Sequence, residues 1–137
     1  MLRKHAIIVI KNKKGEYLQY FEPNWQSYLF LNCKLQDESD TSKIQETISN
    51  LMGVECLQIA YKFNKIHTKY SVKDRINKDY QHFFYLVTLK ENDNLPETEF
   101  TIKNTKFKWF SMEELEKDPR IQEVNSDIVC FIKESNL

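Results

Sequence analysis

Residues 31–54 constrain the fold of this chain most, because their second half carries the signals of a short amphipathic helix. Ser42 and Gln45 have the S-x-x-Q spacing of a capping box, in which two side chains satisfy free backbone amides at a helix start. Gly53 stands where the left-handed residue that closes a helix is least costly. Between these ends the apolar residues recur at i, i+4, i+7 and i+8, on one helix face: Ile44, Ile48, Leu51 and Met52. The sequence therefore predicts a helix over residues 42–52.

Strand-like segments surround this helix. Five runs have the apolar or alternating pattern of strands: residues 5–10, 16–21, 27–31, 54–63 and 81–90. The turn at Gly15 predicts that the first two runs pair as a hairpin. A sixth strand ends at Phe110, where Ser111 and Glu114 form a second capping box, and residues 121–132 have helical apolar spacing. A series of strands that is interrupted by one helix and followed by further helices predicts an α/β/α arrangement around a mixed sheet.

The composition fits one globular domain spanning residues 1–137, with enough hydrophobic residues (41%) for one core. Twenty basic and 20 acidic residues cancel, so the charge gives no signal for nucleic acid or for an anionic membrane. No apolar run approaches the length of a membrane span, and residues 1–5 lead directly into a strand rather than a signal-peptide core. We therefore expect a cytoplasmic protein.

The three cysteines are too far apart for a metal-ligand motif, and their odd number argues against a disulfide framework. They are Cys33, Cys56 and Cys130. Cys33 falls in a predicted loop just before the helix, and a reactive thiol at this position is one hypothesis. The alternative is that all three are ordinary buried or loop thiols.

Two motifs resemble the Nudix hydrolases. The box of that family reads G-x5-E-x7-R-E-U-x-E-E-x-G-U, where U is aliphatic; aligned on Gly53 and Val54, Ile48 takes an aliphatic position and Glu38 the first acid. The second motif is the W-F-S-x-E-E-L run at residues 109–115, at a distance from the box that is common in the family. The resemblance implies a Nudix-type α/β/α sandwich, with a mixed β-sheet flanked by helices.

The chain departs from the family at the positions that carry its chemistry. Glu46 stands at the arginine of the box, and Asn50 and Leu51 stand where the family has its metal-binding glutamate pair. Family members bind magnesium or manganese on carboxylates of this helix, and the metal activates water and neutralises a diphosphate. Residues 42–52 contain one acid, Glu46. The resemblance therefore implies a Nudix fold with a degraded metal site, for which we expect no cofactor.

The alternative is an active enzyme that uses Mg or Mn. The resemblance would then make Glu46 and Glu38 catalytic, and the metal would be held by these two residues with Glu97 and Glu99. The last two lie in an acidic loop, in a part of the chain from which some Nudix enzymes take a catalytic carboxylate.

Ligand-binding candidates come from residues 64–79, where basic and aromatic side chains alternate. Three cations could hold phosphate and one ring could stack on a base: Lys69, Lys73, Arg75 and Tyr70. An ordinary solvated hairpin is the competing interpretation. The resemblance adds Trp25, which matches a tryptophan that commonly precedes the box, and Asn50, as lining of a remnant cleft. His82 resembles a position near the active site of some members. The alternative is that it is a purely structural histidine.

Three functions stay open. The first is a domain that binds a nucleotide-like ligand, such as a nucleoside diphosphate derivative, or a protein partner, without efficient hydrolysis. The second is an active metal-dependent hydrolase that cleaves a nucleoside diphosphate linked to another group. The third is an interaction module with an empty cleft, which docks on another protein or forms a homodimer.

Overall fold

A computed structural model of the chain describes residues 2–71, 74–90 and 94–137. The described strands form one seven-stranded sheet in the order β4-β5-β1-β3-β2-β7-β6. β1 and β5 run parallel, and the other neighbouring strands are antiparallel. The predicted mixed sheet is thus confirmed. The strand bounds are Leu2–Val9 (β1), Tyr17–Glu22 (β2), Ser27–Lys34 (β3), Cys56–Ser71 (β4), Ile76–Leu89 (β5), Phe100–Ile102 (β6) and Thr105–Phe110 (β7).

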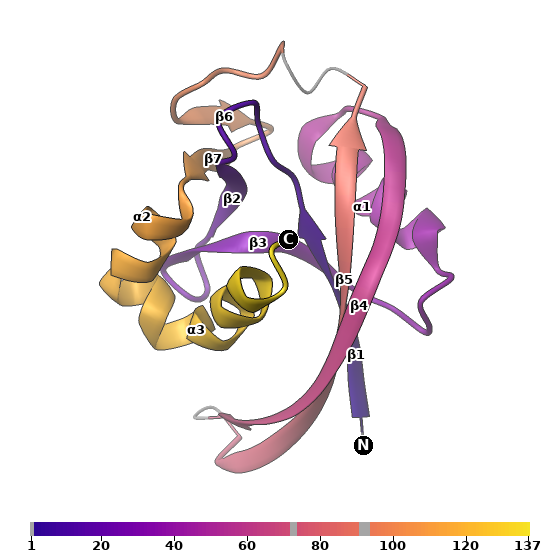
Figure 1. Cartoon of the computed structure of the whole chain (residues 1–137), viewed down its shortest axis with the longest axis vertical. Coiled ribbons are helices and arrows are strands. Elements are labelled where there is room, and N and C mark those ends of the chain that lie inside the picture. Colours follow the sequence, from indigo (N-terminus) through magenta and orange to yellow (C-terminus); the bar gives the residue numbers. More distant parts are fainter. Residues whose placement is uncertain (1, 72–73, 91–93) are drawn as a thin grey trace.

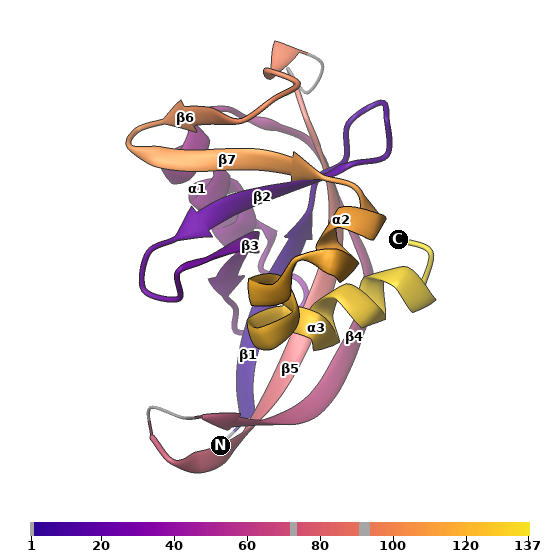
Figure 2. The ribbon, with the colours of Figure 1, turned by 90° about the vertical axis from the view of Figure 1, so that its left-hand side faces the viewer.

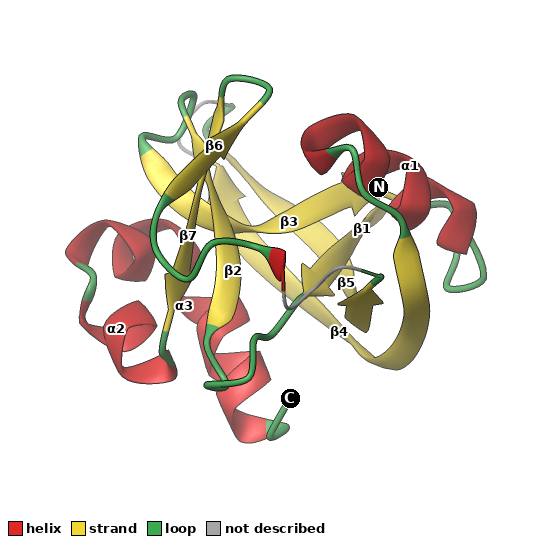
Figure 3. Ribbon diagram, turned by 90° about the horizontal axis from the view of Figure 1, so that it is seen from above, coloured by secondary structure: helices red, strands yellow, loops and turns green. Residues whose placement is uncertain are grey.

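Helices cover both faces of the sheet, as the α/β/α prediction requires. α1 (Thr41–Met52) lies on one face, and α2 (Met112–Lys117) and α3 (Pro119–Glu134) lie on the other (Figures 1 and 3). One apolar core fills the space beneath α1, and a second fills the space beneath α2 and α3. Alternating residues of the central β1 enter the two cores, since Ile8 belongs to the first and Ile7 to the second. In the described part of the chain, no helix is both long and apolar enough to cross a membrane.

β4 and β5 form a long antiparallel hairpin that extends past the helices (Figure 2). The sequence predicted that the strand after α1 ends at residue 63, and this end is wrong, because β4 continues to Ser71. Beyond Phe63 one face of β4 contacts α3. His67 and Lys69 on that face are partly buried, while residues 64–66, 68 and 70 are exposed. The described residues of this segment, 64–71 and 74–79, thus lie in the hairpin.

The ends of the helices test the predicted caps. Gly53 has a left-handed backbone (φ 68°) and closes α1, as predicted. The predicted capping box at Ser42 and Gln45 is wrong: Asp40 is the N-cap of α1, and no side chain caps the helix start. Gln45 instead links its helix to β4, since its side chain donates to Ser49 Oγ and accepts from the Cys56 amide. The capping box at Ser111 and Glu114 is present at the start of α2.

Two predictions about the N-terminal strands also fail. β1 and β2 are not neighbours, because β3 lies between them in the sheet. They are joined only near the turn, where the Leu18 amide donates to the Ile10 carbonyl at 2.9 Å and a bridge links Lys11 to Tyr17 in the described part of the chain. β3 runs on to Lys34, so Asn32 and Cys33 lie in a strand and not in the predicted loop. The extension follows from pairing with β1, whose Ala6 and Ile7 take Cys33 and Asn32 as partners.

Candidate functional site

The outer face of α1 carries few groups that could bind a metal. Ile44, Ile48 and Met52 are buried beneath the helix, whereas Glu46 and Asn50 are exposed. Leu51 is half-buried and packs against the core on the α1 side. The exposed face of the helix therefore presents one carboxylate, from Glu46, and one neutral amide, from Asn50. Leu51 packs against the core and offers no ligand atom.

A polar spot lies where the N-terminal half of α1 meets β3 and β5. The Tyr85 hydroxyl donates to the Glu38 carbonyl at 2.5 Å, and burial raises the pKa of Tyr85 to about 12. Burial also raises the pKa of the Cys33 thiol, an effect that the Thr47 hydroxyl opposes and the Glu46 carboxylate adds to. Glu38 and Glu46 thus both approach the region of Tyr85 and Cys33, from the loop before α1 and from the helix itself.

The other two candidate carboxylates lie elsewhere. Glu97 is within 3.8 Å of Lys14, in the turn between β1 and β2. Glu99 lies beside the hydroxyl of Tyr28, which belongs to the core under α2 and α3, on the opposite face of the sheet from α1. Among the described residues, no three His, Cys, Asp or Glu side chains gather closely enough to share a metal ion. The donor set therefore does not fit Mg²⁺ or Mn²⁺, which take several oxygen ligands at one point.

The predicted ligand-binding residues are not brought together. Lys69 is paired with Asp127 of α3, while Tyr70 projects from the other side of the same strand and is 61% exposed. Arg75 has a left-handed backbone in the turn between β4 and β5. Trp25 is exposed in the β2–β3 turn, where its carbonyl accepts a hydrogen bond from Arg120. Asn50 lies on α1, apart from these residues, and Lys73 lies outside the described residues.

A chain of polar side chains on β2 and β3 was not predicted from the sequence. The Asn32 amide donates to the Tyr20 hydroxyl at 3.3 Å, and that hydroxyl donates to the Glu22 carboxylate at 3.3 Å. Burial raises the pKa of Tyr20 to about 12, so its hydroxyl stays protonated at neutral pH. Tyr20 packs against the core on the α1 side, which places this chain on the same face as α1. Alternation along β2 could have put Tyr20 and Glu22 on one face, but not Asn32 beside them.

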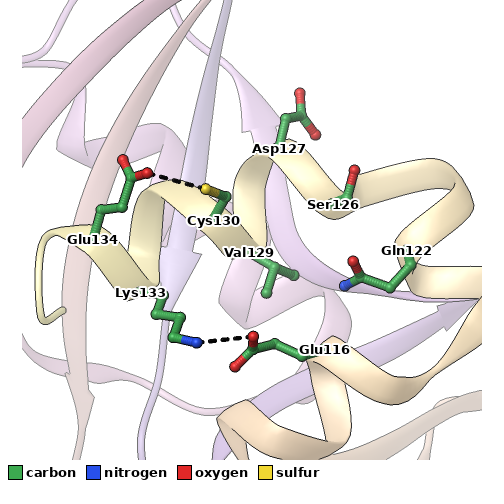
Figure 4. A pocket seen from close by; sticks show the side chains of 8 residues that line it. All are labelled: Glu116, Gln122, Ser126, Asp127, Val129, Cys130, Lys133 and Glu134. Carbon is green, nitrogen blue, oxygen red and sulfur yellow. Dashed lines mark hydrogen bonds and ion pairs between the residues drawn. The ribbon is translucent and has the colours of Figure 1, made fainter.

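A pocket of about 540 Å³ lies on α2 and α3, away from α1 (Figure 4). Its charged side chains are largely engaged with each other: Lys133 pairs with Glu116 at 2.9 Å, and the Cys130 thiol donates to Glu134 at 3.2 Å. The pocket shares no residue with the predicted site.

The cysteines should differ in reactivity, and not in the order that the sequence suggested. Burial raises the pKa of Cys56 to about 11 and raises that of Cys33. The hydrogen bond to Glu134 also raises the pKa of Cys130, but Cys130 is exposed and so accessible to a reagent. Because the thiolate is the nucleophile, we expect iodoacetamide to modify Cys130 first, Cys33 next and Cys56 last, as measured by peptide mass spectrometry. Cys130→Ser should remove the first adduct without accelerating the others. An adduct that forms fastest at Cys33 would restore the reactive-thiol hypothesis.

Solved structures of Nudix proteins superimpose on the chain over nearly its whole length. The MutT protein of Methanosarcina mazei Go1 aligns with a TM-score of 0.65 at 13% identity, covering 98% of this chain and 95% of its own. The Ap4A hydrolase of C. elegans aligns with a TM-score of 0.61 at 13% identity, covering 99% and 97%. The chain has the fold of these proteins, a Nudix-type α/β/α sandwich.

A Nudix hydrolase from Nitrosomonas europaea extends the likeness, with a TM-score of 0.56, 16% identity and coverage of 95% of this chain and 90% of its own. No family model and no curated protein sequence significantly matches the chain. The likeness therefore establishes the fold of this chain alone, and its activity must be argued from its own residues.

Proposed function

We propose that this Nudix-like domain binds a nucleotide-like ligand without efficient metal-dependent hydrolysis. The observation that carries the proposal is the exposed face of α1, where Glu46 is the single carboxylate, Asn50 is neutral and Leu51 packs against the core. A divalent cation that activates water needs several charged oxygen ligands in one place. The separation of Glu97 and Glu99 from α1 supports the same conclusion.

The α1 side of the sheet has groups that could hold such a ligand without a metal. Tyr20 and Asn32 offer neutral hydrogen-bonding groups on the strands. Lys103 reaches the C-terminal end of α1, where its ammonium donates to the Ser49 carbonyl at 3.3 Å, and Lys43 lies close enough to Cys33 to lower its pKa. Two ammonium groups beside α1 favour an anionic ligand. The C. elegans neighbour is named for Ap4A, a nucleotide derivative, which supports the same ligand class.

Calorimetry and an enzyme assay test this proposal. We expect no saturable binding of Mn²⁺ or Mg²⁺ in the micromolar range, and no turnover of nucleoside diphosphate derivatives above background. A thermal-shift screen without metal should find a nucleotide that stabilises the domain, by about 2.7 kcal/mol at a hundred times its dissociation constant. Lys103→Met and Lys43→Met should weaken that stabilisation, while Lys117→Met, on α2, serves as the matched control.

An active hydrolase is the second candidate, and one observation favours it. Glu38 and Glu46 both approach Tyr85 and Cys33, so a ligand that brought its own phosphates could complete a metal site between them. Turnover that requires Mn²⁺ or Mg²⁺ and disappears in Glu46→Gln would establish this activity and overturn our proposal. Glu113→Gln, an exposed helix position on α2, is the control for nonspecific loss of charge.

A further inference from the structure

All three histidines of the chain meet between the β4–β5 hairpin and α3. His5 on β1 and His82 on β5 are cross-strand partners, with ring centroids 6.0 Å apart. His67 on β4 lies next to His82, with ring centroids 4.8 Å apart and Nε2 only 2.7 Å from His82 Nδ1. This cluster lies on the face opposite α1, and the function proposed above does not use it.

α3 contacts the cluster through two side chains one helical turn apart. Asp127 Oδ2 lies 3.3 Å from His67 Nδ1, and the Phe131 ring meets the His67 ring edge-on at 5.3 Å. Lys69 also binds this part of α3, donating to Asp127 at 3.2 Å and to the Val124 carbonyl at 3.5 Å. These contacts hold the helix against β4 just after Asn125, where the helical backbone is interrupted (φ −142°, ψ 21°). The second half of α3 begins after that break, and its Ile128, Val129 and Ile132 are buried in the core on this face of the sheet.

The short contact between the two rings limits how many protons they can hold. Asp127 favours a proton on His67 Nδ1, so His67 Nε2 is free to accept the Nδ1 proton of His82. One further proton can bind the free Nε2 of His82 with this hydrogen bond intact, but burial opposes the positive charge that it brings. A second one would put two N–H groups face to face at 2.7 Å and would break the bond. The hydrogen-bonded pair of His67 and His82 therefore binds fewer protons than two separate imidazoles in water.

The surroundings add to this limit, because they carry more positive than negative charge. β1 supplies Arg3, β3 supplies Lys34, β4 supplies Lys69, and Lys65 of β4 lies over the Phe131 ring. On β5, Tyr80 stacks on His82. The acid that faces the cluster from α3 is Asp127, which is also paired with Lys69. Arg3 and Lys34 thus oppose a proton on His5, Lys69 opposes one on His67 and His82, and Asp127 is the carboxylate that favours it.

We propose that Asp127, His67 and His82 form an acid-sensitive clasp, which holds the second half of α3 on the β4–β5 hairpin at neutral pH and releases it when the pH falls. The clasp would make the exposure of this face of the domain depend on pH, independently of any ligand on the α1 side.

The direction of the effect follows from proton linkage. Burial lowers the pKa of all three histidines, most of all that of His82, to about 3. A histidine with a depressed pKa favours the closed state above its ordinary pKa of about 6.5, and this contribution is lost as the pH falls from 6.5 toward the depressed value. For His82 alone, lowering the pH from about 7.5 to about 5.5 should increase the opening equilibrium constant about tenfold.

Hydrogen–deuterium exchange of the whole domain measures this opening. After correction for intrinsic exchange rates, we expect amides of residues 127–133 and 65–69 to lose about tenfold or more of their protection between pH 7.5 and pH 5.5. Amides of α1, which is remote from the histidines, are the internal control and should keep theirs. Unchanged protection at the clasp would overturn the proposal, and so would an equal loss in α1, because that would indicate general unfolding.

Two histidine variants separate the clasp from its neighbour. His82→Phe keeps a ring of similar size but cannot take a proton, so the pH dependence of exchange in α3 should largely disappear. His5→Phe changes a ring in the same cluster but outside the hydrogen-bonded chain, and most of the dependence should persist. If His82→Phe does not fold, an NMR titration of the His82 ring signals in the unmodified protein tests the clasp instead. A His82 that titrates near pH 6.5 in the folded state would contradict the clasp.

Discussion

Replacing Ile48 by alanine is expected to lower the free energy of unfolding by about 2–5 kcal/mol, because a fully buried isoleucine loses both its burial and its packing. Ile48 is 0% exposed in the centre of α1 and belongs to the core that joins this helix to β3 and β5. Small domains are stable by about 5–15 kcal/mol, so the variant could lose a large part of its stability. Urea denaturation followed by circular dichroism measures the change.

The chain provides a matched control for this substitution. Ile66 on β4 is 64% exposed, so Ile66→Ala removes the same atoms from a solvated position and should change stability by about 0.5 kcal/mol or less. Equal losses in the two variants would mean that α1 is not anchored on the sheet as described. Such a result would also remove the scaffold on which the proposed ligand site depends.

Two single substitutions, each introducing one glutamate of the Nudix box, should lower the free energy of unfolding by very different amounts. Leu51→Glu places a carboxylate against the α1-side core and is expected to destabilise the domain by about 1–3 kcal/mol. Asn50→Glu changes an exposed side chain and should cost less than about 1 kcal/mol, chiefly from a negative charge near the C-terminal end of a helix. Urea denaturation of the two neighbouring variants compares them directly.

The same variants connect stability with function. If Asn50→Glu alone produced measurable Mn²⁺ binding in calorimetry, the loss of hydrolysis would trace to one missing carboxylate. If Leu51→Glu were as harmless as Asn50→Glu, then residue 51 would not be the packing position that the structure shows. We expect that residue 50 tolerates the substitution, whereas residue 51 is needed for packing of the core.

The sequence predicted the elements best where periodicity and burial coincide. The stripe through Ile44 and Ile48 and the closing Gly53 located α1 to within one residue, since both signals act within a few residues of chain. The predicted capping box failed because Gln45 bonds across to the Cys56 amide, a partner 11 residues away. The length of β4 was missed for a similar reason. Its outer half alternates weakly in hydrophobicity, and its burial comes from α3, more than 50 residues further along the chain.

The candidate site was predicted less well than the fold. Positions of the box gave the correct helix, and its exposed Glu46 and half-buried Leu51 could be inferred from the helical face. The spacing of basic and aromatic residues in the hairpin could not show that Lys69 turns toward Asp127 while Tyr70 turns away, because this depends on which face of β4 meets α3. The histidine cluster was equally hidden, since its members come from three strands.

The position of β1 at the centre of the sheet has a consequence for the order of folding. Its parallel partner is β5, in which Asp79 pairs with Leu2 and Leu86 pairs with Val9. The β4–β5 hairpin closes a short loop and can form early, whereas the pairing of β1 with β5 must first overcome the entropy of closing a much longer one. During synthesis β1 leaves the ribosome before β5, so it remains without this partner until β5 has emerged. We therefore expect capture of this strand to set the rate at which the domain folds.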